Sequence, residues 1–450
     1  MKKTDVLIIG GSAAGLVAAS TAKSNYPDKD VTLIRKEEIV MIPCGIPYIY
    51  GTTGTSEKNI LPDAGLLKLG VNIIIDEVLS IDKEAKMCRT KEGEEFEYDK
   101  LIISTGSIPS IPKWLKESDL ENVFTIPKNK VFLDEIQTKL EGCKKIVTIG
   151  AGFIGVELSD ELNKIGREVT LVEKLPHILG LAFDEELAVE AEELLKSRGI
   201  QLLTGVGVKE ILGDRKVSGI LLENGEKIEA DAVILSMGYR PNTKLAEEAG
   251  LKINDIGFIK TDQYRRTDHK DIFAAGDCAE KRDFITGRLN GIMLASTACA
   301  EARVAAMNLY KLSVVKTFAG TIGIYSTAIG ETGFGAAGLT EALAEREGLD
   351  VVTGSFTGID RHPGHIEDSH KQMVKLIASK DSGIILGGEV IGGKSAGELI
   401  NVIGFIIQSR MTIVDLLTSQ IGTQPLLTAS PAGYPLIKAA EVVARNINKN

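Results

Sequence analysis

Two stretches of the chain place small residues at the spacing that binds the diphosphate of a dinucleotide. Each consists of an apolar run, a glycine-rich turn, helix-forming residues and a second apolar run, within about thirty residues. The small residues are Gly10, Ser12 and Gly15 in the first turn and Gly150, Gly152 and Gly155 in the second. The first allows a tight bend, the second close approach of the pyrophosphate, and the third close packing of helix and strand. The free amides at the helix start bind the phosphates, so we predict two dinucleotide sites.

The two stretches differ at the residue that ends the second apolar run. In the second stretch this residue is Glu173, whose carboxylate can accept hydrogen bonds from ribose hydroxyls and would repel a 2′-phosphate. It favours NADH over NADPH, although the adjacent Lys174 weakens this preference. Arg35 occupies the corresponding position in the first stretch, and an arginine cannot accept such hydrogen bonds. The ribose there must be held in another way, by the backbone or by neighbours such as Lys36 and Glu37.

The five cysteines are expected to act only as separate thiols. Their count is odd and none has the C-x-x-C spacing, so neither a disulfide framework nor a zinc site is expected. Cys44 is distinguished by its flanks, Pro43-Cys44-Gly45-Ile46-Pro47, in which Gly-x-Pro could open a helix. The other cysteines have the character of packing or surface positions: Cys88, Cys143, Cys278 and Cys299.

The elements that must position these residues indicate an α/β fold. A chain of 450 residues is too long for one ordinary core, so two or three domains are expected. Each glycine turn begins a Rossmann-like dinucleotide-binding domain, and alternating strands followed by two helices after residue 320 indicate a C-terminal α+β domain. The predicted limits are 1–115 together with 245–320, then 116–244, and finally 321–450.

Charge and hydropathy exclude several classes of protein. With 52 basic and 62 acidic side chains the net charge is −10, which disfavours nucleic acid and anionic membranes as partners. No run of about 18 apolar residues is present, so no membrane span is expected. The N-terminal residues run directly into the first apolar strand instead of forming a signal peptide. We therefore expect a cytoplasmic protein.

Further motifs follow the two glycine turns in a fixed order, namely Thr105-Gly106, Gly276-Asp277 and the C-terminal α+β domain. In this combination the chain resembles the pyridine nucleotide-disulfide oxidoreductase superfamily over essentially its whole length. The resemblance implies FAD on 1–115 with 245–320, NADH on 116–244, and a homodimer formed by 321–450. It also implies that Asp277 binds the ribityl chain, that the helix starting near Leu294 points its positive end at the flavin, and that Phe153 shields the flavin until nicotinamide arrives.

The predicted cofactor-binding residues come from the glycine turns, the strand ends and the helix starts. They are Gly10, Ser12, Ala13, Gly15, Arg35, Lys36, Pro43, Val78, Ser104, Thr105, Gly106, Gly276, Asp277, Leu294, Ala295, Gly150, Gly152, Phe153, Ile154, Gly155, Glu157, Glu173 and Gly238. No metal site is predicted.

Cys44 separates this chain from the two-cysteine members of the superfamily, such as glutathione reductase, which have a C-x-x-x-x-C pair here. Ile39 and Ile49 occupy both five-residue offsets around Cys44. The chain therefore resembles the single-cysteine branch, which contains NADH oxidases, NADH peroxidases, coenzyme A-disulfide reductases and sulfur or polysulfide reductases. The Pro-Cys-Gly-x-Pro form is closer to the oxidases and sulfur reductases. Ala13 stands where the peroxidases have a histidine, which counts against peroxidase activity.

The resemblance makes Cys44 the candidate catalytic thiol. As a thiolate it can attack a disulfide or polysulfide sulfur to give a mixed disulfide, or it can cycle through a sulfenic acid. The ordinary thiol pKa of about 8.5 falls beside cations or a helix N-terminus, and a helix opened by Gly-x-Pro would have that effect.

The acid–base group is not evident from the sequence. Two-cysteine reductases usually receive a His-Pro base from the partner, whereas this chain has Gln424-Pro425, and an amide cannot take a proton at neutral pH. The group must come from elsewhere, or the thiolate is stable without one. His362 precedes Pro363 where relatives often have a tyrosine that reaches across the dimer, so it is a candidate catalytic residue. The histidine-rich segment 361–370 is interpreted as a loop or strand edge in preference to a metal site.

The leading hypothesis is an enzyme that passes electrons from NADH through FAD and Cys44 to a sulfur acceptor, namely a disulfide, coenzyme A disulfide or polysulfide. Oxygen is the close alternative acceptor. Two other classes stay open: a flavoprotein that reduces a small iron–sulfur protein without Cys44, and a redox sensor that binds both nucleotides with negligible turnover.

Overall fold

The first glycine turn lies at the carboxyl edge of a seven-stranded sheet. The structure is a computed structural model that describes residues 1–112, 115, 120–312 and 317–448. The strands of the sheet are β1 (Lys2–Ile9), β2 (Val31–Arg35), β5 (Asn72–Ile75), β6 (Val78–Asp82), β7 (Met87–Thr90), β8 (Glu95–Ile103) and β19 (Ile272–Ala274). Their order is β5-β2-β1-β8-β7-β6, with β19 beside the end of β8. Strands β6 and β7 form an antiparallel hairpin, and the other strands are parallel to one another.

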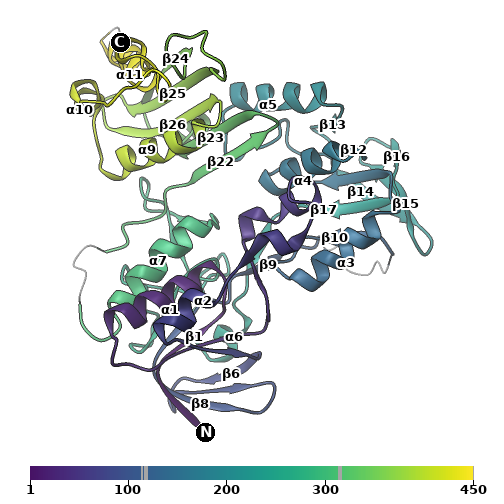
Figure 1. The fold of residues 1–450 in the computed structure, drawn as a ribbon, viewed down its shortest axis with the longest axis vertical. Helices are drawn as coiled ribbons and strands as arrows, with labels where there is room; N and C mark the ends of the chain where they lie inside the picture. Colours follow the sequence, from purple (N-terminus) through teal and green to yellow (C-terminus); the bar gives the residue numbers. More distant parts are fainter. Residues whose placement is uncertain (113–114, 116–119, 313–316, 449–450) are drawn as a thin grey trace.

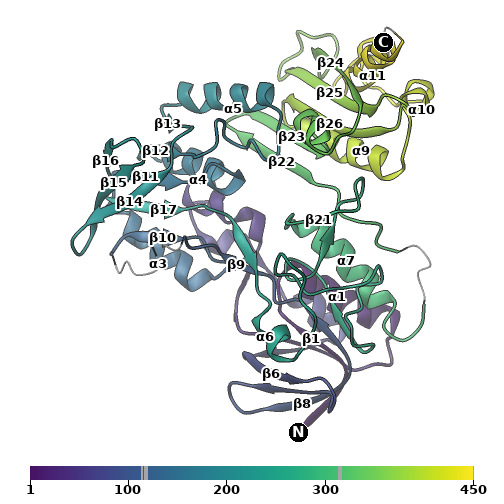
Figure 2. The same ribbon diagram turned by 180° about the vertical axis from the view of Figure 1, so that it is seen from behind.

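Two helices rich in alanine cover one face of this sheet. They are α1 (Ala13–Asn25) and α7 (Ala295–Met307), and Figures 1 and 2 both show them side by side. Small buried side chains such as Ala18 and Ala302 allow the two helices to approach closely. Strand β1 is buried on both faces from Val6 to Ile9, which explains its uninterrupted apolar sequence.

The second glycine turn occupies the same place in a five-stranded parallel sheet. Its strands are β10 (Val123–Thr125), β11 (Lys145–Ile149), β12 (Glu168–Val172), β13 (Gln201–Leu203) and β17 (Ala232–Leu235). They lie in the order β10-β17-β11-β12-β13. The helices of this unit are α3 (Lys130–Leu140), α4 (Phe153–Lys164) and α5 (Glu185–Ser197). An antiparallel sheet adds β14 (Val208–Gly213), β15 (Val217–Leu222) and β16 (Lys227–Glu229).

Two short strands mark the crossing between the units. Strand β9 (Ser107–Pro109) follows the first sheet, and β18 (Tyr239–Pro241) follows the second; they pair in antiparallel fashion. The chain therefore leaves the first unit near residue 109 and returns to it after residue 241. The remaining short elements are β3 (Val40–Met41), β4 (Ile60–Leu61), α2 (Ala64–Leu69), α6 (Lys244–Glu248), β20 (Lys281–Arg282) and β21 (Leu289–Asn290), with 3₁₀ helices Pro43–Gly45, Pro47–Tyr50 and Ser56–Asn59.

The C-terminal part is an antiparallel sheet packed against helices. Its strands are β22 (Ile324–Ile329), β23 (Thr332–Gly338), β24 (Val351–Ile359), β25 (Lys371–Ser379) and β26 (Ile385–Gly392), in the order β22-β23-β26-β25-β24. The helices are α8 (Glu341–Arg346), α9 (Ala396–Gln408), α10 (Ile413–Thr418) and α11 (Pro435–Ile447), with a 3₁₀ helix at Pro431–Gly433. The predicted fold class, two Rossmann-like units and a C-terminal α+β domain, is confirmed (Figure 1).

A buried lysine and four carboxylates join the second unit to the C-terminal domain. The Nζ atom of Lys375 lies 3.0 Å from Asp184, 2.8 Å from Glu186, 3.0 Å from Glu341 and 4.0 Å from Glu389. Oε1 of Glu389 accepts a hydrogen bond of 2.8 Å from the amide of Asp184. Burial, together with the negative charge of Asp184, raises the pKa of Glu389 to about 8. The fold therefore favours the protonated form of Glu389 at neutral pH.

Stability is expected to fall between pH 6 and pH 9 because of this carboxyl group. The pKa of Glu389 in the folded protein exceeds its ordinary value, so folding retains a proton that the unfolded chain has released, and raising the pH toward 8 costs stability. The side chain in Glu389→Gln is neutral at every pH. From pH 6 to pH 9, the free energy of unfolding of Glu389→Gln should therefore rise relative to that of wild type by about 1–3 kcal/mol. Urea unfolding of both proteins at pH 6 and at pH 9 measures this difference in free energy. Glu186→Gln, an exposed partner of the same lysine, should keep the wild-type trend; parallel pH curves for Glu389→Gln and wild type would contradict the prediction.

Candidate active site

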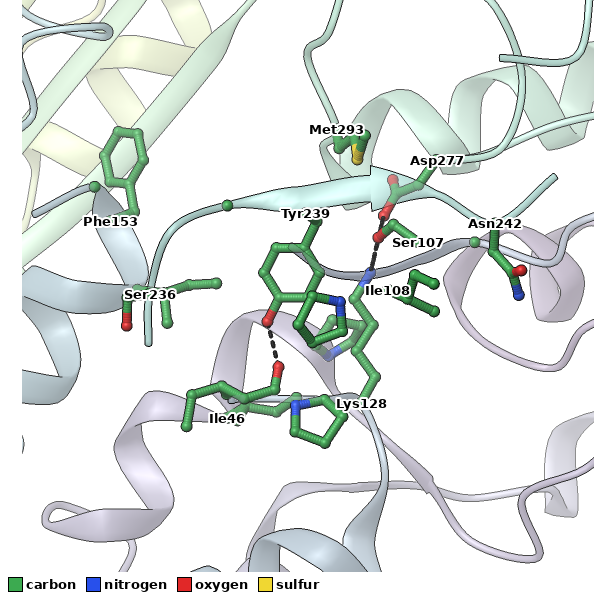
Figure 3. A pocket seen from close by; sticks show the side chains of 18 of the residues that line it. Ile46, Ser107, Ile108, Lys128, Phe153, Ser236, Tyr239, Asn242, Asp277 and Met293 are labelled. Carbon is green, nitrogen blue, oxygen red and sulfur yellow. Dashed lines mark hydrogen bonds and ion pairs between the residues drawn. The ribbon is translucent and has the colours of Figure 1, made fainter. Parts of the chain in front are cut away.

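A cavity of about 1770 Å³ extends between the two glycine turns. Its wall contains both turns, the carboxyl ends of neighbouring strands, the start of α7 and the first residues of β22. An ordinary small-ligand pocket encloses about 300–1,000 Å³, so this cavity has room for more than one such ligand. Figure 3 shows the part of the cavity where Ser107 and Asp277 of the first unit meet Lys128 and Tyr239.

The first turn is closed by glycines that no larger residue could replace. Gly10 has φ +106°, and a Cβ there would lie 2.2 Å from the backbone oxygen of Ser104. A Cβ on Gly15 would lie 1.8 Å from the backbone oxygen of Gly10. Gly15 thus packs the start of α1 against the turn, and Ser12 lines the cavity at the N-cap position of α1.

The second turn repeats this geometry. Gly150 has φ +97°, and a Cβ on Gly155 would lie 1.9 Å from the backbone oxygen of Gly150. Gly152, the N-cap of α4, lines the cavity, and a Cβ there would meet open space among the described residues. Both carboxylate oxygens of Glu173 accept backbone amides, from Ala151 at 2.6 Å and from Leu175 at 2.9 Å. The carboxylate is therefore anchored at the edge of the turn.

Three helices begin at the cavity with their first amides available. The N-cap residues are Ser12 for α1, Gly152 for α4 and Leu294 for α7, and each lines the cavity. Within the described residues, the Ser12 side chain makes no capping hydrogen bond, and Gly152 and Leu294 have no polar side chain that could make one. Free amides at helix starts bind phosphates and other negatively charged groups, so the cavity fits the diphosphates of two dinucleotides.

Asp277 is kept ionised by a lysine of the second unit, Lys128, which lies between β10 and α3. Its Oδ2 atom accepts hydrogen bonds from the Ser107 hydroxyl at 2.7 Å and from Nζ of Lys128 at 2.8 Å (Figure 3). Burial opposes ionisation of Asp277, but Lys128 and Ser107 outweigh it and hold its pKa below the ordinary value. Lys128 also lies 5.5 Å from the centre of the Tyr239 ring, and the Tyr239 hydroxyl donates to the backbone oxygen of Ile126.

The loop that carries Asp277 is held from behind by buried charges. Oε2 of Glu301, on α7, accepts a hydrogen bond from the Gly276 amide at 2.8 Å and lies 2.9 Å from Nζ of Lys281. Oε1 of Glu301 lies 3.3 Å from Arg265. The side chains of Glu301 and Lys281 are fully inaccessible to solvent. These contacts fix Gly276, whose φ is +83°, and through it the direction of Asp277.

Cys44 lies in a short 3₁₀ helix, and its thiol is exposed on the cavity wall. A Cβ on Gly45 would lie 1.9 Å from Oδ1 of Asn59, which explains the glycine that follows the cysteine. Partial desolvation of Cys44 by the cavity wall and, after it, the charge of Glu157 raise the pKa of Cys44, while Lys128 acts in the opposite direction. The groups of the chain thus act against the lowered pKa suggested by the sequence. The helices at Cys44 and at Pro47 are each less than two turns long, so their dipoles are small.

The C-terminal domain closes the wall near Cys44. Thr327 of β22 donates a hydrogen bond of 2.8 Å to Oε1 of Glu157, and burial raises the pKa of Glu157 to about 7. Tyr325 stacks on Phe153 with 5.2 Å between ring centres, and Phe183 packs edge-on against Phe153. In this arrangement the Phe153 ring rests against the C-terminal domain, at some distance from Asp277 in Figure 3.

Comparison with known proteins identifies the family. Residues 4–302 match the family described as pyridine nucleotide-disulphide oxidoreductase, and residues 324–432 match its dimerisation domain. The chain belongs to this family. Two relatives are the NADH oxidase of Methanocaldococcus jannaschii, 31% identical over 98% of this chain and 99% of the relative, and the NAD(P)H sulfur oxidoreductase (CoA-dependent) of Pyrococcus abyssi, 31% identical over 98% of each. The water-forming NADH oxidase from Lactobacillus brevis, solved bound to NADH, matches with a TM-score of 0.90 and 27% identity over 99% of each chain.

The family, the fold and the cofactor pair predicted from the sequence are confirmed: the protein is an NADH-dependent flavoprotein oxidoreductase that uses FAD. In the part of the chain that the structure describes, no helix is long and apolar enough to cross a membrane. Those residues also contain no cluster of three or more histidine, cysteine, aspartate or glutamate side chains that could hold a metal ion.

Nearly all the predicted cofactor residues of the oxidoreductase line this one cavity. Gly15 and Gly155 lie behind the turns instead, where they pack helix against strand. Arg35 lines the cavity, but its guanidinium turns toward Asp63, with two contacts of 2.6 Å, and donates to the backbone oxygen of Glu37. Only the stem and backbone of Arg35 are therefore available to a nucleotide. Glu37 and Lys36, 3.7 Å apart, line the cavity beside it.

His362 is not brought to Cys44 within this chain. Nδ1 of His362 lies 2.8 Å from the backbone oxygen of Thr428, and its amide donates to the backbone oxygen of Pro425. The loop of His362 thus packs on the loop of Gln424, and both loops lie outside the described wall of the cavity. The sequence placed both in the dimer-forming part of the oxidoreductase but gave no sign that they touch.

Several residues of the site were not found from the sequence. Lys128, Tyr239 and Tyr325 line the cavity, yet none belongs to a glycine turn or to the segment around Cys44. Tyr239 directly follows Gly238, which was predicted, so strand continuation could have indicated it. No local signal marks Lys128 or Tyr325, since their partners Asp277 and Phe153 are distant in sequence.

Proposed function

We propose that the first unit holds FAD, that the second holds NADH, and that Cys44 passes the electrons to a disulfide, coenzyme A disulfide or polysulfide. Bound FAD supplies a two-electron relay between the nicotinamide and the thiol. The observation that carries this proposal is the exposed thiol of Cys44 on the wall of the cavity that contains both glycine turns. The other cysteines are buried or half-buried: Cys88, Cys143, Cys278 and Cys299.

The covalent step uses a single sulfur of this chain. The Cys44 thiolate attacks one sulfur of the acceptor, forms a mixed disulfide and releases the other sulfur as a thiolate that takes up a proton. Two electrons and a proton then cleave the mixed disulfide, which restores Cys44 and releases the second thiol. We place the carboxyl group of Glu157 beside this step. Its pKa is about 7, and it accepts a hydrogen bond from Thr327.

Oxygen is the second candidate acceptor. The raised pKa of Cys44 favours it, because a protonated thiol attacks disulfides slowly, and a relative of similar identity is named an NADH oxidase. NADH consumption by the FAD-loaded protein distinguishes the two candidates. We expect turnover without oxygen in the presence of coenzyme A disulfide or polysulfide; consumption that requires oxygen and ignores both sulfur compounds would overturn the sulfur proposal.

We propose a homodimer formed by the C-terminal domain, with limits as predicted from the sequence at 321–450. The match to a dimerisation domain supports it. Val402 and Phe405 of α9 project to solvent one helical turn apart, with Phe405 68% exposed. The loops of His362 and Gln424 lie outside the described cavity wall of their own chain, which supports a contribution of both loops to the Cys44 site of a second copy. We also propose the other two domain limits as predicted from the sequence, 1–115 with 245–320 and 116–244, and a cytoplasmic location.

Phe405→Glu is expected to weaken the dimer at least tenfold in dissociation constant. A buried phenylalanine contributes about 1.5–3 kcal/mol, and a two-fold interface loses it twice. Sedimentation equilibrium against the subunit mass of 48.3 kDa measures the change. Phe132→Glu, on α3 outside the C-terminal domain, is the matched control and should stay dimeric. A wild-type monomer, or equal dissociation of both variants, would speak against this interface.

A further inference from the structure

Four charged side chains line the cavity beside the second glycine turn. They are Glu173, Lys174, Lys209 and Glu223. Glu173 follows β12 directly, Lys209 lies on β14, and Glu223 follows β15 directly. With two positive and two negative charges, this group is neutral as a whole. In a dinucleotide-binding unit this edge, next to the residue that ends the second strand, is where the adenosine ribose lies.

Two of the four carboxylate oxygens in this group already accept hydrogen bonds from backbone amides. Both belong to Glu173, which accepts the amides of Ala151 and Leu175. The negative charge of Glu173 is thus fixed at the ribose position and cannot swing away from a 2′-phosphate. Glu173 alone therefore disfavours NADPH.

Lys174 is the side chain that could reverse this preference, but Glu223 holds it. Nζ of Lys174 lies 3.1 Å from Oε1 of Glu223. Glu223 is in turn attached to the neighbouring loop, since its amide donates to the backbone oxygen of Gly207 at 2.9 Å. The carboxylate folds back over Gly207 so closely that a Cβ there would lie 2.6 Å from Cδ of Glu223.

We propose that Glu223 is a selectivity residue that excludes NADPH by neutralising Lys174. A basic side chain at this place is what accommodates a 2′-phosphate in dinucleotide-binding units. With Glu223 present, a 2′-phosphate meets the fixed charge of Glu173, a second carboxylate and a lysine whose charge is already paired. Without it, Lys174 and Lys209 face a single carboxylate. This inference rests on the proposed function in one respect, that the second unit binds the nicotinamide nucleotide.

The test compares ADP-ribose with 2′-phospho-ADP-ribose, which carry the adenosine end without the nicotinamide. Binding to the FAD-loaded protein is measured by calorimetry at low salt. We expect wild type to prefer ADP-ribose, and Glu223→Gln to shift the ratio of the two dissociation constants about tenfold toward the 2′-phosphate. Because both partners are largely exposed, at 74% and 51%, the shift should shrink in 0.5 M salt.

Two further variants isolate the mechanism. Glu226→Gln removes an equal charge from the same hairpin at an exposed position outside the lining of the cavity, and it should leave the ratio at the wild-type value. Lys174→Gln combined with Glu223→Gln should cancel most of the shift. An unchanged ratio in Glu223→Gln, or the same shift in Glu226→Gln, would overturn the role of Glu223. Failure of wild type to bind ADP-ribose at all would instead overturn the nucleotide site of the second unit, and this inference with it.

Discussion

Cys44→Ser is expected to lower NADH oxidation with coenzyme A disulfide or polysulfide by about a thousandfold or more. A serine hydroxyl forms no mixed disulfide, so the covalent step is lost entirely, and a thousandfold corresponds to about 4 kcal/mol of activation free energy. Reduction of the flavin by NADH should continue at the wild-type rate, because the thiol lies beyond that step in the proposed sequence. The variant therefore separates the two halves of the reaction.

The measurement has two parts. Stopped-flow absorbance without oxygen follows flavin reduction, and steady-state NADH consumption follows each acceptor. Cys299→Ser is the matched control, since Cys299 is half-buried on α7, lies outside the described lining of the cavity, and places its thiol 3.9 Å from the backbone oxygen of Ala13. We expect it to retain sulfur turnover. Equal rates for wild type and Cys44→Ser with both sulfur acceptors would refute a role for the thiol, and oxygen consumption that survives in Cys44→Ser would assign the thiol to sulfur chemistry alone.

The parts of the fold that the sequence predicted are those with local signals. Each glycine turn combines a steric requirement, such as the φ of +106° at Gly10, with apolar runs on either side, and both signals lie within one strand–turn–helix–strand unit. The same reasoning holds for the Gly276–Asp277 turn. Helix α7 was expected to start near Leu294 from the family resemblance, and its buried alanines pack against those of α1.

The parts that the sequence did not predict depend on partners far along the chain. Arg35 could not be interpreted because its counter-ion Asp63 lies 28 residues away. The pKa of Cys44 is raised by burial and then by Glu157, which the fold brings from the other nucleotide unit. A carboxylate in that position opposes thiolate formation, whereas the local Pro-Cys-Gly-x-Pro pattern indicated the reverse. Electrostatics of this kind follow from tertiary placement, so a single sequence cannot supply them.

Loss of Glu301 is expected to be the most destabilising of the changes considered for this protein. Glu301 is the carboxylate that lies between Lys281 and Arg265, at 2.9 Å and 3.3 Å, and all three side chains are almost wholly inaccessible. Burial already lowers the pKa of Lys281, which shows how little the surroundings tolerate a positive charge. Removing one member of a buried charge pair leaves the other uncompensated, which typically costs about 3–5 kcal/mol.

Glu301→Gln should therefore lower the free energy of unfolding by about 3 kcal/mol or more, measured by urea unfolding. It should also release FAD, because the uncompensated Lys281 donates to the backbone oxygen of Gly276 in the loop that directs Asp277; the flavin absorbance per mole of purified protein reports this. Adding Lys281→Met removes the stranded charge and should recover at least about 1 kcal/mol, because a buried ion pair contributes little beyond its own desolvation. Glu229→Gln, which breaks an exposed pair with Lys145, should cost less than about 1 kcal/mol. If Glu301→Gln were no more destabilising than Glu229→Gln, the buried charges could not be what fixes the Gly276–Asp277 loop.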